Sequence, residues 1–201
     1  MTTIAPARTR EEWLENAVVA LKPLFDEIDV ELPKVRVSVG WPSQGGLKSK
    51  GRVIGQCWKT TVATDGVAQM FLSPMLDEPL LLLATLVHEL IHAVDDCESG
   101  HRGAFAKMAR GIGLEGKMTA TVAGSELEEK LVGIFMEQLG PFPHAAINFE
   151  ELEKERAKTK QSTRMLKLEC PNDGYIVRTT AKWLDSLGAP QCPCGEEMEP
   201  A

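Results

Sequence analysis

Residues 79 to 92 read PLLLLATLVHELIH, and this stretch decides how the rest of the chain is expected to fold. Its apolar residues recur at helical spacing and fill so much of the helix that most of its sides must be buried. Pro79 suits the first turn of such a helix, and Asp77 is the predicted N-cap. The helix is expected to end near Asp96, with Gly100 in the turn that follows. We therefore predict a buried central helix around which the other elements pack.

Two histidines lie four residues apart in this helix, so that His88 and His92 share one face. Two neutral imidazoles on one face suit Zn²⁺, and Glu89 beside them can take the proton of a zinc-activated water. The surrounding residues are too apolar for a surface helix in which His and Glu are ordinary polar residues. The pattern therefore predicts a zinc site with His88 and His92 as ligands and Glu89 as the catalytic residue.

The third zinc ligand has two candidates, because a catalytic zinc takes three protein ligands and keeps its fourth position open. His101 follows His92 directly after Gly100, where a turn can bring it back to the metal. Glu115 lies further along the chain, near the separation at which zinc peptidases with a Glu ligand place that residue. Three of the 4 histidines fall between positions 88 and 101, which favours His101. The fourth, His144, is expected to be a plain loop residue.

The residues before the motif predict one helix and a small sheet. Thr9 and Glu12 form a capping box for a first helix, which Pro23 is expected to end or kink. Strands are expected over residues 35–39, 53–62 and 67–73. A tight hairpin turn at Asp65-Gly66 should join the last two strands, because Asp-Gly favours positive φ. The loop at 40–51 is a candidate lid for the site or a plain connector.

After the motif, the pattern predicts helices over residues 103–112 and 125–139 and a charged helical linker over 150–167.

The composition, with 43% hydrophobic and 25% charged residues, is that of a globular protein. A net charge of −7 argues against nucleic-acid binding by the whole surface. Residues 154–182, however, carry eight basic side chains against three acidic ones, which makes this segment either a solvated face or a place of DNA contact. Without an export signal or a membrane-length apolar stretch, we expect a cytoplasmic protein with no membrane contact.

Three of the 5 cysteines lie near the C-terminus, which indicates metal-binding thiolates in place of disulfides. Cys170 and the pair Cys192 and Cys194 bracket a segment in the manner of the two knuckles of a zinc ribbon. Asp173 stands where a further Cys would be expected. Since Asp can also ligate zinc, these four residues are candidate ligands of a structural zinc, and the alternative is a ribbon that has lost its metal.

The remaining cysteines, Cys57 and Cys97, are interpreted as free thiols that are buried or partly buried. In the C-terminal segment, Trp183 and Leu184 are expected to pack its small core. Four nearby residues could contact phosphates: Arg178, Thr179, Thr180 and Lys182.

The run from His88 to His92, followed by Gly100-His101-Arg102-Gly103-Ala104-Phe105, resembles the SprT-like zinc metallopeptidase domain. That family carries an HExxH helix, a third His in a Gly-His-Gly-like turn, and a Phe at the start of the next helix. Arg102, inserted after His101, is a small departure that removes no ligand. The resemblance covers residues 65–115 best and extends to the C-terminal module. This sequence looks closest to the phage and bacterial members of the family.

The resemblance implies an α+β fold with a zincin-like metallopeptidase core. This core consists of an N-terminal helix, a small mostly antiparallel sheet and the HExxH helix, and is expected to span residues 1–149. The linker over 150–167 would lead to a zinc-ribbon-like module over 168–201.

The activity that the resemblance implies is that of a zinc endopeptidase acting on protein or peptide substrates, including proteins associated with DNA. Zn²⁺ would be held by His88, His92 and His101, with Glu89 as general base. Asp95 or Asp96 could orient an imidazole.

The strand that ends at Ser73-Pro74 could be an edge onto which an extended substrate adds.

The alternative to a protease is a scaffold of the same shape without proteolytic activity. Such a scaffold would bind nucleic acid, or a transcription or replication partner, through its ribbon and basic linker.

Overall fold

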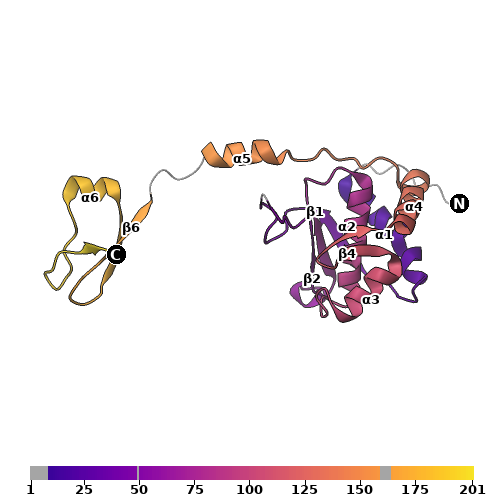
Figure 1. The fold of residues 1–201 in the computed structure, drawn as a ribbon, viewed down its shortest axis with the longest axis horizontal. Helices are drawn as coiled ribbons and strands as arrows, with labels where there is room; N and C mark the ends of the chain where they lie inside the picture. Colours follow the sequence, from indigo (N-terminus) through magenta and orange to yellow (C-terminus); the bar gives the residue numbers. More distant parts are fainter. Residues whose placement is uncertain (1–8, 49, 159–163) are drawn as a thin grey trace. The chain divides into compact units, whose positions relative to one another are not determined.

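The computed structural model describes residues 9–48, 50–158 and 164–201. The chain divides into two compact units, Met1–Asn148 and Phe149–Ala201. The first unit contains the HELIH motif and the second contains the C-terminal cysteines (Figure 1). Helices and small sheets make up both units, so the expected α+β class is confirmed. No helix in the described part of the chain combines the length and apolarity needed to cross a membrane.

The first unit has its helices and strands in mixed order along the chain. In sequence these are α1 (Arg10–Asp26), β1 (Val35–Val39), β2 (Gly55–Trp58), η1 (Thr60–Val62), β3 (Ala68–Leu72), α2 (Pro79–Val94), α3 (Gly103–Ile112), β4 (Leu114–Lys117), β5 (Ala120–Ala123), α4 (Ser125–Ile134) and η2 (Phe135–Leu139).

Helix α1 begins where the capping box predicts, since the Thr9 hydroxyl accepts a hydrogen bond from the Glu12 N–H at 3.1 Å. Pro23 lies inside the helix and does not end it, because the helix continues to Asp26. Pro23 is on the solvent-exposed side, where water can bond to the carbonyl that loses its helical partner.

The main sheet of the first unit is mixed, with strand order β1-β3-β2. Strand β1 pairs with β3 in parallel, from Val35 opposite Ala68 to Val39 opposite Leu72, whereas β2 pairs with β3 antiparallel. The expectation of a mostly antiparallel sheet is therefore wrong for one of the two pairings. Strand β3 is central, so the prediction that the strand ending at Ser73-Pro74 is a free edge is wrong as well. The edge strands are β1 and β2.

The connection from β2 to β3 is longer than the predicted hairpin. Gly66 has the positive φ (67°) that the Asp-Gly turn requires. However, β2 already ends at Trp58, and η1 follows before the turn. The side chain of Asp65 accepts from the backbone N–H of Val67 and pairs with Arg36.

Helix α2 is the buried helix that the sequence predicts. Its N-cap is Glu78 and not Asp77, because the Glu78 carboxylate accepts from the backbone N–H groups of Leu80 at 3.0 Å and Leu81 at 2.5 Å. Pro79 follows at the first helical position, as expected. Six side chains of this helix are completely buried: Leu82, Leu83, Leu86, Val87, Leu90 and Ile91. Together with α1, α2 covers the face of the sheet that carries the buried β3 residues Ala68, Met70 and Leu72.

Two features after α3 depart from the expected pattern. A hairpin of β4 and β5 follows the left-handed Gly113 (φ 103°), in a stretch for which no strand was predicted. Helix α4 ends at Ile134 and continues as the π-helical turn η2, so the single helix expected over 125–139 has two parts. The loop after η2 is tied back to the core, because the Trp13 indole N–H donates to the Gly140 carbonyl at 3.0 Å.

The second unit contains α5 (Phe149–Lys158), β6 (Met165–Glu169), β7 (Ile176–Thr180), α6 (Ala181–Leu187) and β8 (Glu199–Pro200). The strands form an antiparallel sheet of order β7-β6-β8, and β6 begins inside the range expected for the linker. The linker residues 159–163 lie outside the described part of the chain. A small core joins Leu168, Cys170, Cys192 and Met198. Leu184 packs against this core as predicted, but Trp183 is 52% exposed and does not.

Candidate metal centre and active-site cleft

Three imidazoles converge at one point in the first unit. His88 and His92 come from α2, and His101 comes from the turn before α3. The Nε2 atom of His101 lies 3.2 Å from the Nε2 atoms of both His88 and His92. Nitrogen ligands about 2.0–2.1 Å from a tetrahedral zinc are separated by roughly 3.3–3.4 Å. The two Nε2–Nε2 distances therefore suit a zinc ion bound between the three rings.

The turn after α2 is shaped to bring His101 back toward the helix. Gly100 and Gly103 both have positive φ, 55° and 49°, which glycine adopts without strain. The Asp95 carboxylate accepts from the Ser99 N–H at 3.1 Å and so holds the start of the turn. Completely buried Phe105 then packs against all three rings, with ring centroids 4.3 Å from His92, 4.9 Å from His88 and 5.1 Å from His101.

The hydrogen bond that Nδ1 of His88 makes leaves its Nε2 atom available to a metal. Nδ1 of His88 lies 2.9 Å from the Thr121 hydroxyl on β5. A proton on Nδ1 that is donated to Thr121 leaves the Nε2 lone pair free for a metal. Among the described residues, the buried side-chain polar atoms without a hydrogen-bond partner are Nδ1 of His92 and Oδ1 of Asp95. They belong to residues three positions apart at the end of α2, and the Asp95 carboxylate raises the pKa of His92.

The imidazoles are held neutral, as metal ligation requires. Burial, with the neighbouring His92 and His101, lowers the pKa of His88 to about 3. Burial and the His101 ring lower the pKa of His92 to about 4, and burial also lowers the pKa of His101. Neutral imidazoles offer lone pairs, whereas imidazolium ions would repel a cation.

Glu89 is buried beside this cluster, with 5% of its surface exposed. Burial raises the pKa of its carboxyl to about 8, the Cys97 thiol adds to this effect, and a hydrogen bond from the backbone of Cys57 opposes it. A divalent cation at the histidines would favour the ionised carboxylate, because an opposite charge nearby lowers a carboxyl pKa.

Gly55 on β2 leaves the space that Glu89 occupies. A methyl group on Gly55 would lie 2.9 Å from both Cγ and Cδ of Glu89, and closer still to Oε1. The packing of β2 against α2 at this point therefore requires glycine. Nothing in the sequence pattern singled out Gly55, since its role depends on a neighbour 34 positions along the chain.

These groups lie in one open cleft of about 810 Å³. The cleft is lined by residues 51–57, which include most of β2, and by Lys117 and residues 119–122 of the β4–β5 hairpin. The cleft also contains Leu81 and Thr85 from the first turns of α2. The hairpin wall, with Thr121, is the part of the site that the sequence interpretation missed.

The other candidates from the sequence lie elsewhere. Glu115 is not part of the histidine cluster, and its carboxylate packs against Gly124. Asp96 does not orient an imidazole, because its carboxylate accepts from the backbone N–H and the hydroxyl of Thr60, at 2.7 and 3.0 Å. His144 ties its loop to the Pro74 carbonyl at 2.8 Å.

We expect Thr121→Val to weaken zinc binding at the histidines by about 10-fold to 100-fold, because His88 loses the partner that fixes its tautomer. Competition with a chromogenic chelator measures this change. Thr119→Val is the matched control, since Thr119 lines the same wall and makes no contact with the rings among the described interactions. Equal affinities of the two variants would contradict the role of Thr121.

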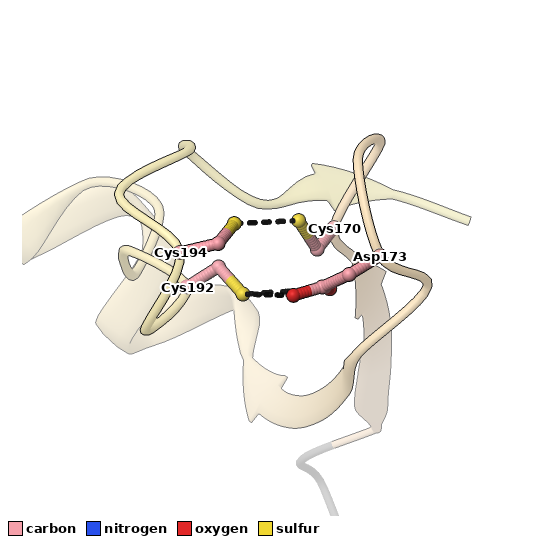
Figure 2. Close-up of side chains that lie close together, drawn as sticks. All are labelled: Cys170, Asp173, Cys192 and Cys194. Atoms are coloured by element: carbon pink, nitrogen blue, oxygen red, sulfur yellow. Dashed lines mark hydrogen bonds between the residues drawn. The ribbon is translucent and has the colours of Figure 1, made fainter.

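A second cluster of ligand atoms lies in the second unit, where Cys170 and Asp173 face Cys192 and Cys194 (Figure 2). The Cys170 and Cys194 sulfurs are 3.5 Å apart, and the Cys192 sulfur is 3.3 Å from Oδ2 of Asp173. Thiolates bound to zinc at about 2.3 Å have sulfurs roughly 3.8 Å apart. The four predicted ligands are therefore brought together at a spacing that suits a metal such as zinc.

Asp173 is prepared for this role by its turn. The backbone N–H of Tyr175 donates to its carboxylate at 3.0 Å and, with the neighbouring thiols, keeps the pKa of Asp173 below its ordinary value. Gly174 and Gly195 have positive φ, 73° and 97°, and allow the two knuckles to bend around the site. The carboxylate can thus take the place of a fourth thiolate.

We expect Asp173→Ala to lower the zinc content from about two to about one per chain after dialysis, because one of four ligands of the second cluster is lost. Asp173→Cys should keep about two zincs and resist chelators better, since a thiolate binds zinc more tightly than a carboxylate. Metal analysis by mass spectrometry measures both variants. A single zinc in wild-type protein, still present in Asp173→Ala, would show that the second cluster holds none.

Two further thiols line the first cleft, from Cys57 on β2 and Cys97 in the loop after α2. The Cys97 thiol donates to the Cys57 carbonyl at 3.7 Å, and the interaction between the two thiols lowers the pKa of Cys97 and raises that of Cys57. Both cysteines are partly buried free thiols, as the sequence predicts.

Comparisons of the chain with models of protein families, with curated proteins and with solved structures found no match. The case for a function therefore depends on the residues and their geometry.

Proposed function

We propose that the first unit is a zinc-dependent endopeptidase of the SprT-like type. The observation that carries this proposal is the presence of three converging imidazole nitrogens and a buried carboxylate in one open cleft. A structural zinc site is closed by a fourth protein ligand, whereas the described residues around His88, His92 and His101 supply three. The open side faces the cleft, where a substrate could enter.

Zinc at the three histidines would act as a Lewis acid that lowers the pKa of water and polarises a peptide carbonyl. Glu89 would take the proton of the attacking water and deliver it to the leaving amine. Burial raises the pKa of Glu89, which favours its taking up a proton in the first of these transfers. His88, Thr121 and Phe105 contribute by fixing the geometry of the rings.

Strand β2 is the structural basis for substrate binding in this proposal. It is one of the two edge strands of its sheet, so one row of its backbone groups has no strand partner in the described fold. It also forms a wall of the cleft next to Glu89. An extended peptide added to this edge would place its backbone beside the metal ligands with little dependence on sequence.

We expect Gly55→Ala to retain zinc and reduce kcat/KM for peptide cleavage by about 100-fold or more, because the new methyl group displaces Glu89. Gly51→Ala, at a glycine of the same wall with open space around its Cβ position, controls for a general effect of alanine, although its positive φ adds strain. Cleavage of a fluorescent peptide and metal analysis are measured together. Full activity of Gly55→Ala would contradict the placement of Glu89.

The proposal is tested by cleavage of an unfolded protein such as casein. Zinc-loaded protein should produce new peptide termini, chelation should stop this, and added zinc should restore it. Assays with and without single-stranded DNA address the basic segment at 154–182. Absence of cleavage under all these conditions would favour the second candidate, a binding scaffold.

Exposed side chains of the second unit support a nucleic-acid contact for either candidate. Arg178 on β7 is exposed, and Trp183 and Tyr175 are about half exposed. The Lys182 ammonium lies 4.8 Å from the centre of the Trp183 ring. Basic groups next to exposed aromatic rings suit single-stranded nucleic acid, in which phosphates and bases are both accessible. DNA binding without cleavage would be the result expected of a scaffold.

A further inference from the structure

The dithiol pair of Cys57 and Cys97 has no part in the proposed zinc chemistry, yet it lies in the wall of the same cleft. Cys57 and Gly55 are two residues apart on β2, so they face the same side of the strand, toward Glu89. The Cys57 thiol therefore lies between the edge strand and the end of α2. The Cys97 thiol donates to the Cys57 carbonyl oxygen at 3.7 Å, and both side chains line the same cleft.

The loop that carries Cys97 is held in an uncommon backbone conformation. Asp96 and Cys97 have positive φ values of 48° and 59°, which residues other than glycine rarely adopt. Two anchors keep the loop in place. The Cys97 N–H donates to the His92 carbonyl at 2.8 Å, and the Asp96 carboxylate accepts from Thr60 just after β2. Strained backbone that persists because its surroundings hold it is characteristic of functional positions.

We propose that Cys57 and Cys97 are a redox-sensitive pair that forms a reversible intramolecular disulfide in the wall of the metal cleft. The thiols are neighbours in the reduced protein, and both border the open cleft, so a small oxidant can reach them. Their separation along the sequence is 40 residues, so the bond would link β2 to the loop after α2.

Hydrogen peroxide is a suitable oxidant, and the reaction has two balanced steps. One cysteine sulfur attacks a peroxide oxygen, the O–O bond breaks, and a sulfenic acid and one water form. The second sulfur then attacks the sulfenic sulfur, the S–O bond breaks, and a disulfide and a second water form. A thiol reductant reverses the change by thiol–disulfide exchange.

The consequence for catalysis rests on the proposed function. A disulfide sets the two sulfurs about 2.05 Å apart, closer than any non-bonded contact, so β2 and the loop must move together. Strand β2 positions Glu89 in two ways. The backbone of Cys57 forms a hydrogen bond with the Glu89 carboxylate, and the missing side chain of Gly55 leaves room for it. We therefore expect the oxidised protein to cleave peptides about 10-fold more slowly or worse, and to recover on reduction.

The test uses the full-length zinc-loaded protein, treated with hydrogen peroxide, alkylated and digested with trypsin. Cleavage after Arg52, Lys59 and Arg102 places Cys57 in a peptide of residues 53–59 and Cys97 in one of residues 60–102. The second-unit cysteines fall in other peptides, so their oxidation is read separately. The expected result is a linked 53–59/60–102 pair in monomeric protein that disappears on reduction and in both Cys57→Ser and Cys97→Ser.

The proposal would be overturned if both peptides carried only alkylated or singly oxidised cysteines, or if the link occurred only between two chains. An unchanged cleavage rate in the linked protein would overturn the regulatory consequence. The factor by which oxidation lowers the cleavage rate is compared between wild type and Cys97→Ser, and the difference isolates the effect of this pair. If reduced wild-type protein cleaves nothing, the proposed function fails, while the linked peptides still decide whether the disulfide forms.

Discussion

Glu89→Gln is expected to retain zinc at the histidines and to lose peptide cleavage by about 100-fold to 10,000-fold, the range of general acid–base catalysis. Gln fills the same buried space beside Gly55, so the packing of α2 against β2 should persist. It cannot accept a proton from water, and the proton transfer to the leaving amine is lost as well. The measurement is kcat/KM for a quenched fluorescent peptide, together with zinc content.

The matched control is Glu98→Gln, which makes the same chemical change three residues before His101 in the sequence. The Glu98 side chain is 72% exposed and pairs with Lys59, outside the metal cluster. This variant should cleave at a rate within about twofold of wild type, since exposed ion pairs contribute little to stability. A Glu89→Gln enzyme with activity close to that of Glu98→Gln would refute the assignment of Glu89 as the base.

His101→Ala is expected to remove zinc from the first cleft, and with it all cleavage that depends on zinc. His88 and His92 alone leave two nitrogens, one fewer than catalytic zinc sites use. The zinc of the second unit should remain, so the content should fall from about two to about one per chain. Phe105 and the glycine turn do not depend on the His101 ring for their own packing, so the variant should fold.

Glu115→Ala decides between the two candidates for the third ligand. The Glu115 carboxylate packs against Gly124, outside the histidine cluster, so this variant should keep both zincs and its cleavage activity. Metal analysis of the two variants in parallel makes the comparison. Loss of zinc from Glu115→Ala but not from His101→Ala would reverse the assignment.

The helical elements could be predicted because their signals are local. The capping box at Thr9 marks the start of α1, and the leucine-rich run marks α2. Each of these signals comes from residues within or next to the helix that it predicts. Asp77 was the wrong N-cap because the choice between neighbouring acids depends on which side chain reaches the free N–H groups, and Glu78 reaches them. The three histidines and the four C-terminal candidate ligands could also be predicted from the sequence, since only a few residue types bind metals.

The parts that escaped prediction depend on pairing between distant residues. The parallel pairing of β1 with β3 places β2 at the edge, and no local pattern in these strands specifies that order. The strands of the β4–β5 hairpin, LEGK and ATVA, are each four residues long, too short for an alternating pattern to stand out in the sequence. Thr121 and Gly55 matter only because these strands meet α2. The cleft is therefore a product of strand order, which the sequence patterns did not define.

A crystal structure of the zinc-loaded protein, with anomalous difference maps measured on both sides of the zinc edge, would locate the metal directly. We expect a zinc peak about 2.0–2.1 Å from Nε2 of His88, His92 and His101. The fourth coordination position should open into the cleft, within hydrogen-bond reach of Glu89. Zinc at the C-terminal cysteines and none at the histidines would rule out a catalytic zinc in the first unit, as would a fourth protein ligand that closes the histidine site.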